Sequence, residues 1–371
     1  MEKAKISASQ LFILMVMFEL GTSILLPMGM GAKQDAWLAI LVGMIISFLL
    51  FFVYHQLYLY YPDRLLTQYT QEILGKFIGR ILAFLYILYF AYFAARILRD
   101  FGELLLTFAY PETPLFIANA LLMLVIIYTV RKGIEVISRS GELFFIFMYT
   151  LAVTGFILII VSGLIHVTNL QPVLEKGMLP VLKVVFTKTL YYPFGQVIVF
   201  TMIFPYLTHS KKAKITGLCA LGLSGINLAI IMLINISVLG VSLTERSQFP
   251  LLSTVQSIQV ANFLERLDVF FMFALIITSF VKINVFFYAV VIGMTNLFKI
   301  QSPSRMTYPL GLVILFLSMT IASNYQEQFY EGQTIVPFIL HLPFQVIIPL
   351  LLLTVVFLRK TRGRVMKNFK N

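Results

Sequence analysis

Two of the apolar stretches that are long enough to cross a membrane are interrupted near their middles. Residues 10–30 form the first stretch, which is interrupted at Gly21-Thr22-Ser23. Residues 184–207 form the sixth, which is interrupted at Tyr192-Pro193-Phe194-Gly195-Gln196. Unpaired backbone groups at membrane depth must be buried in protein or line a cavity. The matched pair of interruptions therefore predicts a small-solute site near the bilayer midplane.

The first interruption offers hydrogen-bond donors. An unwound Gly21 frees backbone N–H groups, and a half-helix that follows it would present its positive dipole end. Thr22 and Ser23 add two hydroxyls. A carboxylate suits such a set of donors. The alternative is a close contact between helices, for which small residues are common in membrane bundles.

The second interruption offers acceptors and aromatic faces. Pro193 and Gly195 loosen the helix, so that its free carbonyls can hold an ammonium group while the rings of Tyr192 and Phe194 cover a side chain. Each ring could instead face lipid or the core, since aromatic residues make up 15% of the chain. Together the two interruptions favour a zwitterion, such as an amino acid, as the ligand.

Glu19 and Lys282 are charged residues near the middles of their spans. A charge at that depth indicates a functional site, with a partner to be named. We expect the two to form an intramembrane pair, either at the ligand site or as a structural lock between two helices. Thr278 and Ser279 lie one turn before Lys282 and would face the same site.

Four more charged residues lie in the outer half of the third span, and these are Arg96, Arg99, Asp100 and Glu103. Arg96 with Asp100, and Arg99 with Glu103, are each four residues apart, so each pair shares a helical face. Pairing within the helix at the membrane surface is the preferred interpretation. A vestibule leading to the ligand site is the alternative.

No residue pattern indicates catalysis or metal binding. The four histidines lie far apart in the sequence, and neither a phosphate-binding glycine loop nor a nucleophile–base pair is present. The sequence therefore predicts neither an enzyme nor a bound metal or cofactor.

The elements that position these residues must be membrane helices, because 60% of the 371 residues are hydrophobic and only 12% are charged. A soluble protein of this size could not bury so much apolar surface. We predict an all-α polytopic membrane protein. Its ten transmembrane helices are placed at residues 10–30, 37–59, 81–109, 115–130, 142–164, 184–207, 215–240, 268–298, 307–323 and 337–358.

The net charge of +12 is unevenly distributed. With both termini in the cytoplasm, most of the 28 Lys and Arg residues fall in cytoplasmic loops or in the basic tail, residues 359–371, which is the pattern of the positive-inside rule. We interpret the tail as a signal for orientation and for lipid headgroups rather than as a partner site. The charge does not indicate nucleic acid.

Two longer connections predict an internal repeat. Pro62–Gly79, on the cytoplasmic side, and Pro250–Arg266, on the outside, both have the pattern of an amphipathic helix. An inverted five-plus-five repeat produces such a pair, whereas two unrelated interfacial segments are the alternative. We therefore predict one transmembrane domain, residues 1–371, with repeats at about 9–165 and 183–359. This is the LeuT-like architecture of amino-acid and amine transporters, with the first and sixth helices broken.

Short segments along the chain resemble the membrane-embedded B subunits of bacterial spore germinant receptors. Their order and spacing carry the resemblance over essentially the whole chain, through residues 6–12, 18–22, 33–37, 61–62, 192–195 and 280–282 and the basic tail. That family is similar to the amino-acid/polyamine/cation transporters. The resemblance implies a nutrient sensor in the spore inner membrane, acting with an A subunit and a lipoprotein C subunit.

These predictions combine into one expected function. We expect a sensor that binds a small zwitterion at the midplane and signals through its partner subunits. In the LeuT-like arrangement the first and eighth spans enclose a cation site, and we hypothesise that the Lys282 ammonium takes the place of sodium there. An amino-acid permease is the alternative, because it would use the same site and differ in turnover. A channel or scaffold subunit with a vestigial pocket is a third interpretation.

Overall fold

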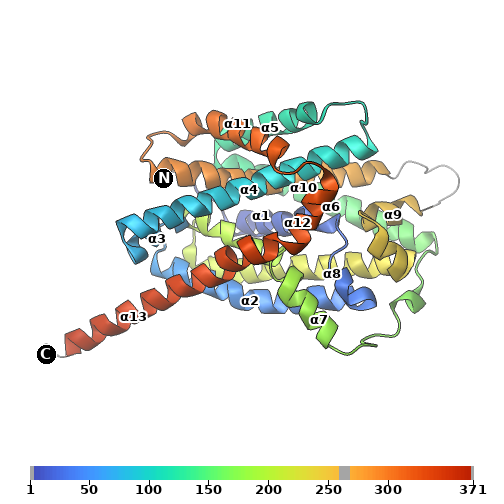
Figure 1. The fold of residues 1–371 in the computed structure, drawn as a ribbon, viewed down its shortest axis with the longest axis horizontal. Helices are drawn as coiled ribbons and strands as arrows, with labels where there is room; N and C mark the ends of the chain where they lie inside the picture. Colours follow the sequence, from blue (N-terminus) through green and yellow to red (C-terminus); the bar gives the residue numbers. More distant parts are fainter. Residues whose placement is uncertain (1–3, 259–267, 369–371) are drawn as a thin grey trace.

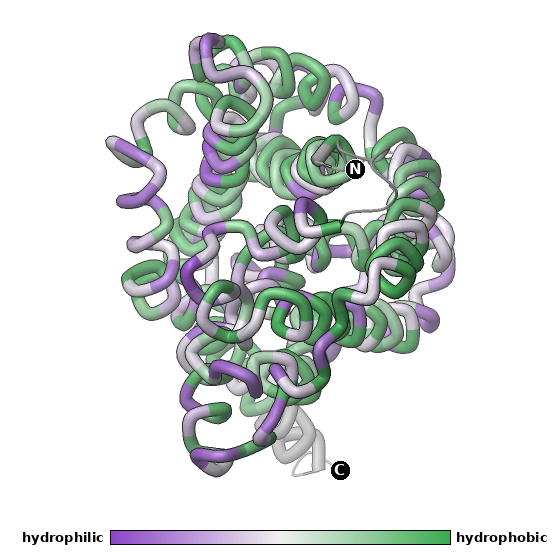
Figure 2. The backbone as a smooth tube through the Cα atoms, turned by 90° about the vertical axis from the view of Figure 1, so that its right-hand side faces the viewer, coloured by the Kyte–Doolittle hydropathy of each residue, from purple (hydrophilic) through white to green (hydrophobic). Residues whose placement is uncertain are grey.

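The chain folds into a bundle of helices, which the computed structural model describes for residues 4–258 and 268–368 (Figure 1). Within these residues, the only extended pairing is a parallel bridge between Ile6 and Leu207. Figure 2 shows hydrophobic residues throughout the bundle, including the helices at its periphery. The expectation of an all-α membrane protein is confirmed.

Seven helical segments of the described chain are long and apolar enough to cross a membrane. They are Met30–Tyr60, which contains α2 (Ala36–Tyr60); α4 (Lys76–Phe108); α5 (Leu115–Lys132); α6 (Ile134–Val161); Ser210–Arg246, which contains α8 (Ala213–Arg246); α10 (Asp268–Leu297); and Pro337–Arg359, where a π-helix (Pro337–Ile347) leads into α13 (Ile348–Asn368). An eighth consists of α11 (Pro303–Thr320) and α12 (Tyr325–Thr334), which are bent by 98° relative to each other.

The two other predicted spans are the first and the sixth, and both are broken. The first consists of α1 (Ala8–Leu20) and a 3₁₀ turn (Gly21–Ile24). The sixth consists of α7 (Leu179–Val184), a π-turn (Val185–Thr189) and a 3₁₀ helix (Phe194–Met202). The described chain therefore follows the predicted order of spans, with seven or eight of full length rather than ten, because the breaks shorten the first and the sixth.

Local sequence explains where the first span begins and ends. The Ser7 hydroxyl accepts a hydrogen bond from the Gln10 N–H, and the Gln10 side chain accepts one from the Ser7 N–H, so the two form a capping box. At the other end, Gly21 adopts φ +26°, in the region that favours glycine, and α1 stops there. The predicted break is thus built into the sequence.

The predicted amphipathic helix at Pro62–Gly79 is too long. Gly75 adopts φ +85° and divides this segment. The amphipathic part is α3 (Leu66–Leu74), and the residues after Gly75 already belong to α4. The matching segment after α8 is helical in α9 (Pro250–Gln256), and residues 259–267 of the prediction lie outside the described residues.

The predicted start of the fifth span, residue 142, is also wrong. Helix α6 begins at Ile134, about two turns earlier. Glu135 and Arg139 lie within it and form an ion pair of 2.6 Å at i,i+4 spacing. The charges that mark a loop in the sequence are therefore compatible with helix, because each neutralises the other at the membrane surface.

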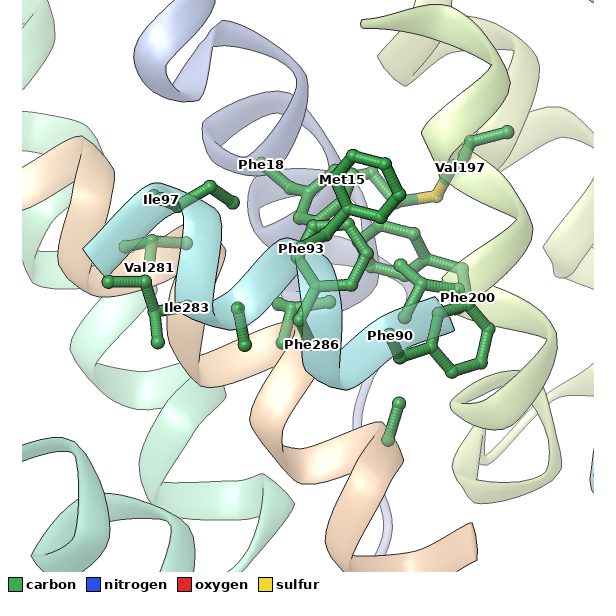
Figure 3. Close-up of a cluster of buried hydrophobic side chains, with 14 of the residues drawn as sticks. Met15, Phe18, Phe90, Phe93, Ile97, Val197, Phe200, Val281, Ile283 and Phe286 are labelled. Atoms are coloured by element: carbon green, nitrogen blue, oxygen red, sulfur yellow. The ribbon is translucent and has the colours of Figure 1, made fainter. Parts of the chain in front are cut away.

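Aromatic packing around α10 holds the broken helices in place (Figure 3). The Phe18 ring of α1 lies 5.2 Å from Phe200 of the 3₁₀ helix and 5.1 Å from Phe286 of α10. The Phe93 ring of α4 lies 6.0 Å from Phe286. All four side chains are buried, so this cluster joins α1, α4, α10 and the sixth span close to the two breaks.

The outer surface is apolar, as a lipid solvent requires. On α6, the side chains of Leu143 and Ile146 are each 67% exposed. A continuous apolar surface of this kind is stable when it faces hydrocarbon. The protein is an integral membrane protein.

Candidate ligand site at the two broken helices

The first break is short. After α1, the chain makes one 3₁₀ turn and then a loop in which Gly29 adopts φ +73°. Thr22 and Ser23 are buried in that turn. The expected half-helix with a positive dipole end is absent from this described segment, because a single 3₁₀ turn follows Gly21 instead.

The second break is made by a change of helix type. The π-turn Val185–Thr189 widens the helix, and the N–H groups of both Tyr191 and Tyr192 then donate to the Lys188 carbonyl. Beyond Pro193 the chain continues as a 3₁₀ helix. The span therefore changes its hydrogen-bonding pattern twice around Tyr192, which is the loosening that Pro193 and Gly195 predict.

Gly195 is needed for close packing against the tenth span. A Cβ at this position would overlap the Gln345 amide and lie 3.0 Å from the Leu190 carbonyl oxygen. Phe194, beside it, is fully buried. Both residues thus support the shape of the break rather than line a cavity.

The two breaks meet through a hydrogen bond. The hydroxyls of Thr22 and Tyr192 lie 2.6 Å apart. Beneath them lies Lys282 of α10, whose Nζ is 4.5 Å from the centre of the Tyr192 ring and 5.1 Å from that of Phe18. The Lys282 stem occupies the space that a side chain at Gly21 would need, since a Cβ there would lie 2.6 Å from Cδ. Three distant segments are therefore joined at one place.

Glu19 and Lys282 are not joined by a hydrogen bond. Both side chains are fully buried. Within the described part of the chain, neither Glu19 carboxylate oxygen nor Lys282 Nζ has a hydrogen-bond partner. The ammonium also lies over the faces of two aromatic rings, which attract it. Both charges lie close to the breaks, and they attract each other through space without a direct contact.

Thr278 and Ser279 lie fully buried on α10. The Thr278 hydroxyl donates to the Ala274 carbonyl of its own helix at 2.6 Å. The Ser279 hydroxyl has no partner among the described residues. Both residues are therefore buried on the same helix as Lys282. The Thr278 hydroxyl already has a hydrogen-bond partner, and the Ser279 hydroxyl does not.

A cavity of about 400 Å³ extends from the two breaks toward α12. Of the predicted ligand residues in the described chain, Thr22 and Tyr192 line it, whereas Gly21, Ser23, Phe194, Gly195, Thr278 and Ser279 do not. Charged side chains of both signs also line it, and these are Arg96, Asp100, Lys188 and Glu245. Its size suits a small solute, and its lining offers partners to both ends of a zwitterion.

The four charges of the third span divide into two kinds. Arg99 and Glu103 form an ion pair of 2.7 Å, which agrees with pairing within the helix. Arg96 and Asp100 line the cavity, which agrees with the vestibule alternative. Both contact Gln328 of α12, which accepts a hydrogen bond from Arg96 and donates one to Asp100. Sequence reasoning did not predict Gln328.

A second polar group that sequence reasoning missed lies on the tenth span. His341 lines the cavity, and its Nδ1 lies 2.9 Å from the Tyr89 hydroxyl and 2.7 Å from Gln345 Nε2. The ring stacks on Phe93, with centroids 4.7 Å apart. Polar residues four apart in an apolar span are the signal that could have identified His341 and Gln345.

The arrangement matches a known class of membrane protein. The chain is similar to the solved structure of Mhp1, a nucleobase-cation-symport-1 family transporter, in a closed conformation with bromovinylhydantoin bound. The TM-score is 0.65 at 14% sequence identity, over 88% of this chain and 74% of that one. The fold is thus LeuT-like, as predicted from the paired breaks and the repeat of spans.

The family follows from the sequence comparisons. A family model described as spore germination protein matches residues 5–326, so the chain belongs to the spore germination protein family. It is 54% identical to spore germination protein KB of Bacillus subtilis (strain 168), over 98% of this chain and 97% of that protein. It is 26% identical to spore germination protein A2 of the same organism, over 86% and 90% of the two chains. These relatives are germination proteins rather than enzymes.

Proposed function

We propose that this chain is the ligand-binding membrane subunit of a spore germinant receptor. It binds a small zwitterion, such as an amino acid, in the 400 Å³ cavity at the two breaks. Binding shifts the equilibrium between two arrangements of the bundle, because the ligand has a higher affinity for one of them. Partner subunits, an A subunit and a lipoprotein C subunit, read out that shift in the spore inner membrane.

The observation that carries this proposal is the lining of the cavity. Its inner end is formed by Thr22 and Tyr192, whose hydrogen bond joins the two breaks. Its sides carry Arg96 and Asp100, so the cavity presents opposite charges to one small ligand. A ligand that separates Thr22 from Tyr192 would uncouple the first and sixth spans. That movement provides a way to transmit binding to the rest of the bundle.

Direct binding tests the proposal. The full chain, reconstituted in lipid nanodiscs, is titrated calorimetrically with the twenty L-amino acids and with D-glucose as an uncharged probe. We expect at least one amino acid to bind and Thr22→Leu to abolish that binding, because the larger side chain fills the inner end of the cavity. Thr150→Leu is the matched control, since Thr150 is exposed on α6.

Two results would contradict the proposal. One is binding of D-glucose alone, which would exclude a zwitterion. The other is wild-type affinity in Thr22→Leu, which would place the ligand elsewhere.

The transporter-like fold also supports an amino-acid permease. Uptake of the radiolabelled ligand into proteoliposomes separates the two functions, because a sensor binds its ligand without accumulating it. In spores, Thr22→Leu should abolish germination in response to that ligand while subunit levels on a blot stay normal.

A further inference from the structure

Helix α12 covers one side of the cavity. Five of its residues line it, and these are Tyr325, Phe329, Tyr330, Gly332 and Gln333. The helix is bent by 98° relative to α11. In Figure 1 it connects α11 to the segment that leads into α13. Any movement of α12 would therefore change the wall of the cavity.

Gln328 attaches α12 to α4 through both its backbone carbonyl and its side-chain amide. Its backbone carbonyl accepts a hydrogen bond from the Arg96 guanidinium. Its side-chain Nε2 donates to the Asp100 carboxylate at 2.6 Å and to the Arg96 carbonyl at 3.0 Å. Gln328 is fully buried. Gly332, one turn later, allows this approach, because a Cβ there would overlap the Arg96 guanidinium.

The chemistry of this attachment imitates a ligand. An oxygen on a guanidinium and an N–H donor on a carboxylate are the contacts that the two ends of a free amino acid would make. In Gln328 both groups are neutral, so they give Arg96 and Asp100 hydrogen bonds but no opposite charge. The bonds of Gln328 are already charge-assisted, because one partner in each is ionised. The carboxylate and ammonium of a zwitterion would add direct Coulombic attraction to Arg96 and Asp100, which neutral groups cannot supply. A zwitterion therefore has an advantage over the glutamine.

We propose that Gln328 is an internal stand-in for the ligand, occupying the two binding residues until an α-amino acid displaces it. This rests on the proposed function and names the ligand class and its partners. Arg96 holds the ligand carboxylate, and Asp100 holds its ammonium group. Displacement frees α12 from α4, which couples occupancy of the cavity to the position of that helix.

Removing the stand-in should tighten binding. The full chain in nanodiscs is titrated with the amino acid that binds the wild type, and Gln328→Leu is compared with Gln326→Leu. Gln326 is exposed on the same helix, so the control makes the same substitution outside the contact. Gln328→Leu removes the two hydrogen bonds of Nε2, including the one to Asp100, and leaves the backbone carbonyl on Arg96. We expect the Kd of Gln328→Leu to fall about five- to tenfold, because the competing conformation is less favoured. The Kd of Gln326→Leu should stay at the wild-type value.

Asp100→Asn independently tests whether Asp100 holds the ammonium group of the ligand. This test remains available if Gln328→Leu does not fold. Asparagine keeps an acceptor for Gln328 but removes the charge. We expect affinity for the amino acid to fall about tenfold or more. The corresponding carboxylic acid without the amino group should bind at least as well as it binds the wild type. A merely structural role of Asp100 would weaken both ligands equally.

The position of α12 provides a third measurement. In a Cys219→Ser background, which removes the single cysteine of the chain, Gln333→Cys reports on the cavity wall through its rate of maleimide labelling. Labelling should accelerate with the amino acid and in Gln328→Leu.

Unchanged or weaker binding in a folded Gln328→Leu would overturn the inference, as would equal losses for both ligands in Asp100→Asn. Amino-acid binding to the wild type in the same titrations would leave the proposed function standing.

Discussion

Two clusters each combine a positive and a negative side chain that is buried or partly buried, and they differ in whether their charged atoms have hydrogen-bond partners. Arg96 and Asp100 share Gln328 as a common hydrogen-bond partner beside the cavity. Glu19 and Lys282, behind the breaks, have no hydrogen-bond partners for their charged atoms among the described residues. The Lys282 ammonium lies against the rings of Phe18 and Tyr192 instead.

The difference separates an exchangeable contact from a fixed one. A charge bridged by a neutral amide can change partners at small cost, because a ligand offers equivalent hydrogen bonds. A buried charge without hydrogen bonds lowers the stability of the folded protein, and it is retained where packing or function requires it. We therefore expect the cluster beside the cavity to respond to ligand, and the cluster of Glu19 and Lys282 to hold the breaks in position.

The largest expected effect comes from breaking the fixed cluster. Lys282→Met removes the ammonium from beside Tyr192 and Phe18 and leaves Glu19 buried without a compensating charge nearby. We expect a loss of about 3 kcal/mol in the free energy of unfolding. The double variant Glu19→Gln/Lys282→Met should recover most of it. Thermal unfolding in nanodiscs measures this, and equal losses in the single and double variants would show that the charges are not coupled.

A second prediction about Lys282 tests the hypothesis that its ammonium takes the place of a coupling cation. Ligand binding by the wild type should then have the same Kd in sodium and in choline buffers. A sodium requirement in the wild type would contradict the hypothesis. If Lys282→Met left both expression and ligand response unchanged, the residue would have neither role.

The packing at the second break should give the next largest effect. Gly195→Ala places a Cβ where the Gln345 amide lies, so we expect a loss of about 1–3 kcal/mol in stability from overpacking. Gln345→Ala, added to it, should relieve the strain. Gly222→Ala is the control, because a Cβ there would make an ordinary contact of 3.8 Å with Phe48. A Gly195→Ala protein as stable as this control would disprove the close approach.

The hydrogen bond that joins the two breaks should have a moderate effect. Thr22→Val and Tyr192→Phe each remove one hydroxyl of a pair 2.6 Å apart. We expect a coupling of about 1 kcal/mol in a double-mutant cycle of unfolding free energies. Strictly additive losses would mean that the two hydroxyls do not depend on each other.

The exposed ion pair of Glu135 and Arg139 on α6 should give the smallest effect. It is the surface counterpart of the two clusters inside the protein. Glu135→Gln removes an ion pair whose side chains are 46% and 69% exposed. Such pairs contribute about 0.5 kcal/mol or less, so stability and ligand Kd should hardly change. A loss as large as that of Lys282→Met would mean that burial does not separate the clusters.

Much of the fold could be predicted because its causes are local. The length and apolarity of the spans follow from the solvent, and Gly21 and Pro193 mark the breaks through their own backbone preferences. Boundaries were less certain where charged residues pair within a helix, as Glu135 and Arg139 do. Gly75 also divides what the sequence pattern presents as one amphipathic segment.

By itself, then, the sequence determined that this is a membrane protein with two broken spans and that Thr22 and Tyr192 lie at the breaks. Only the tertiary structure decided what they meet. The partnership of Arg96 and Asp100 with Gln328 joins residues 232 and 228 positions apart. Tyr89, His341 and Gln345 are brought together in the same way. Contacts of this kind depend on the rotation and packing of whole helices, which no local pattern of residues specifies.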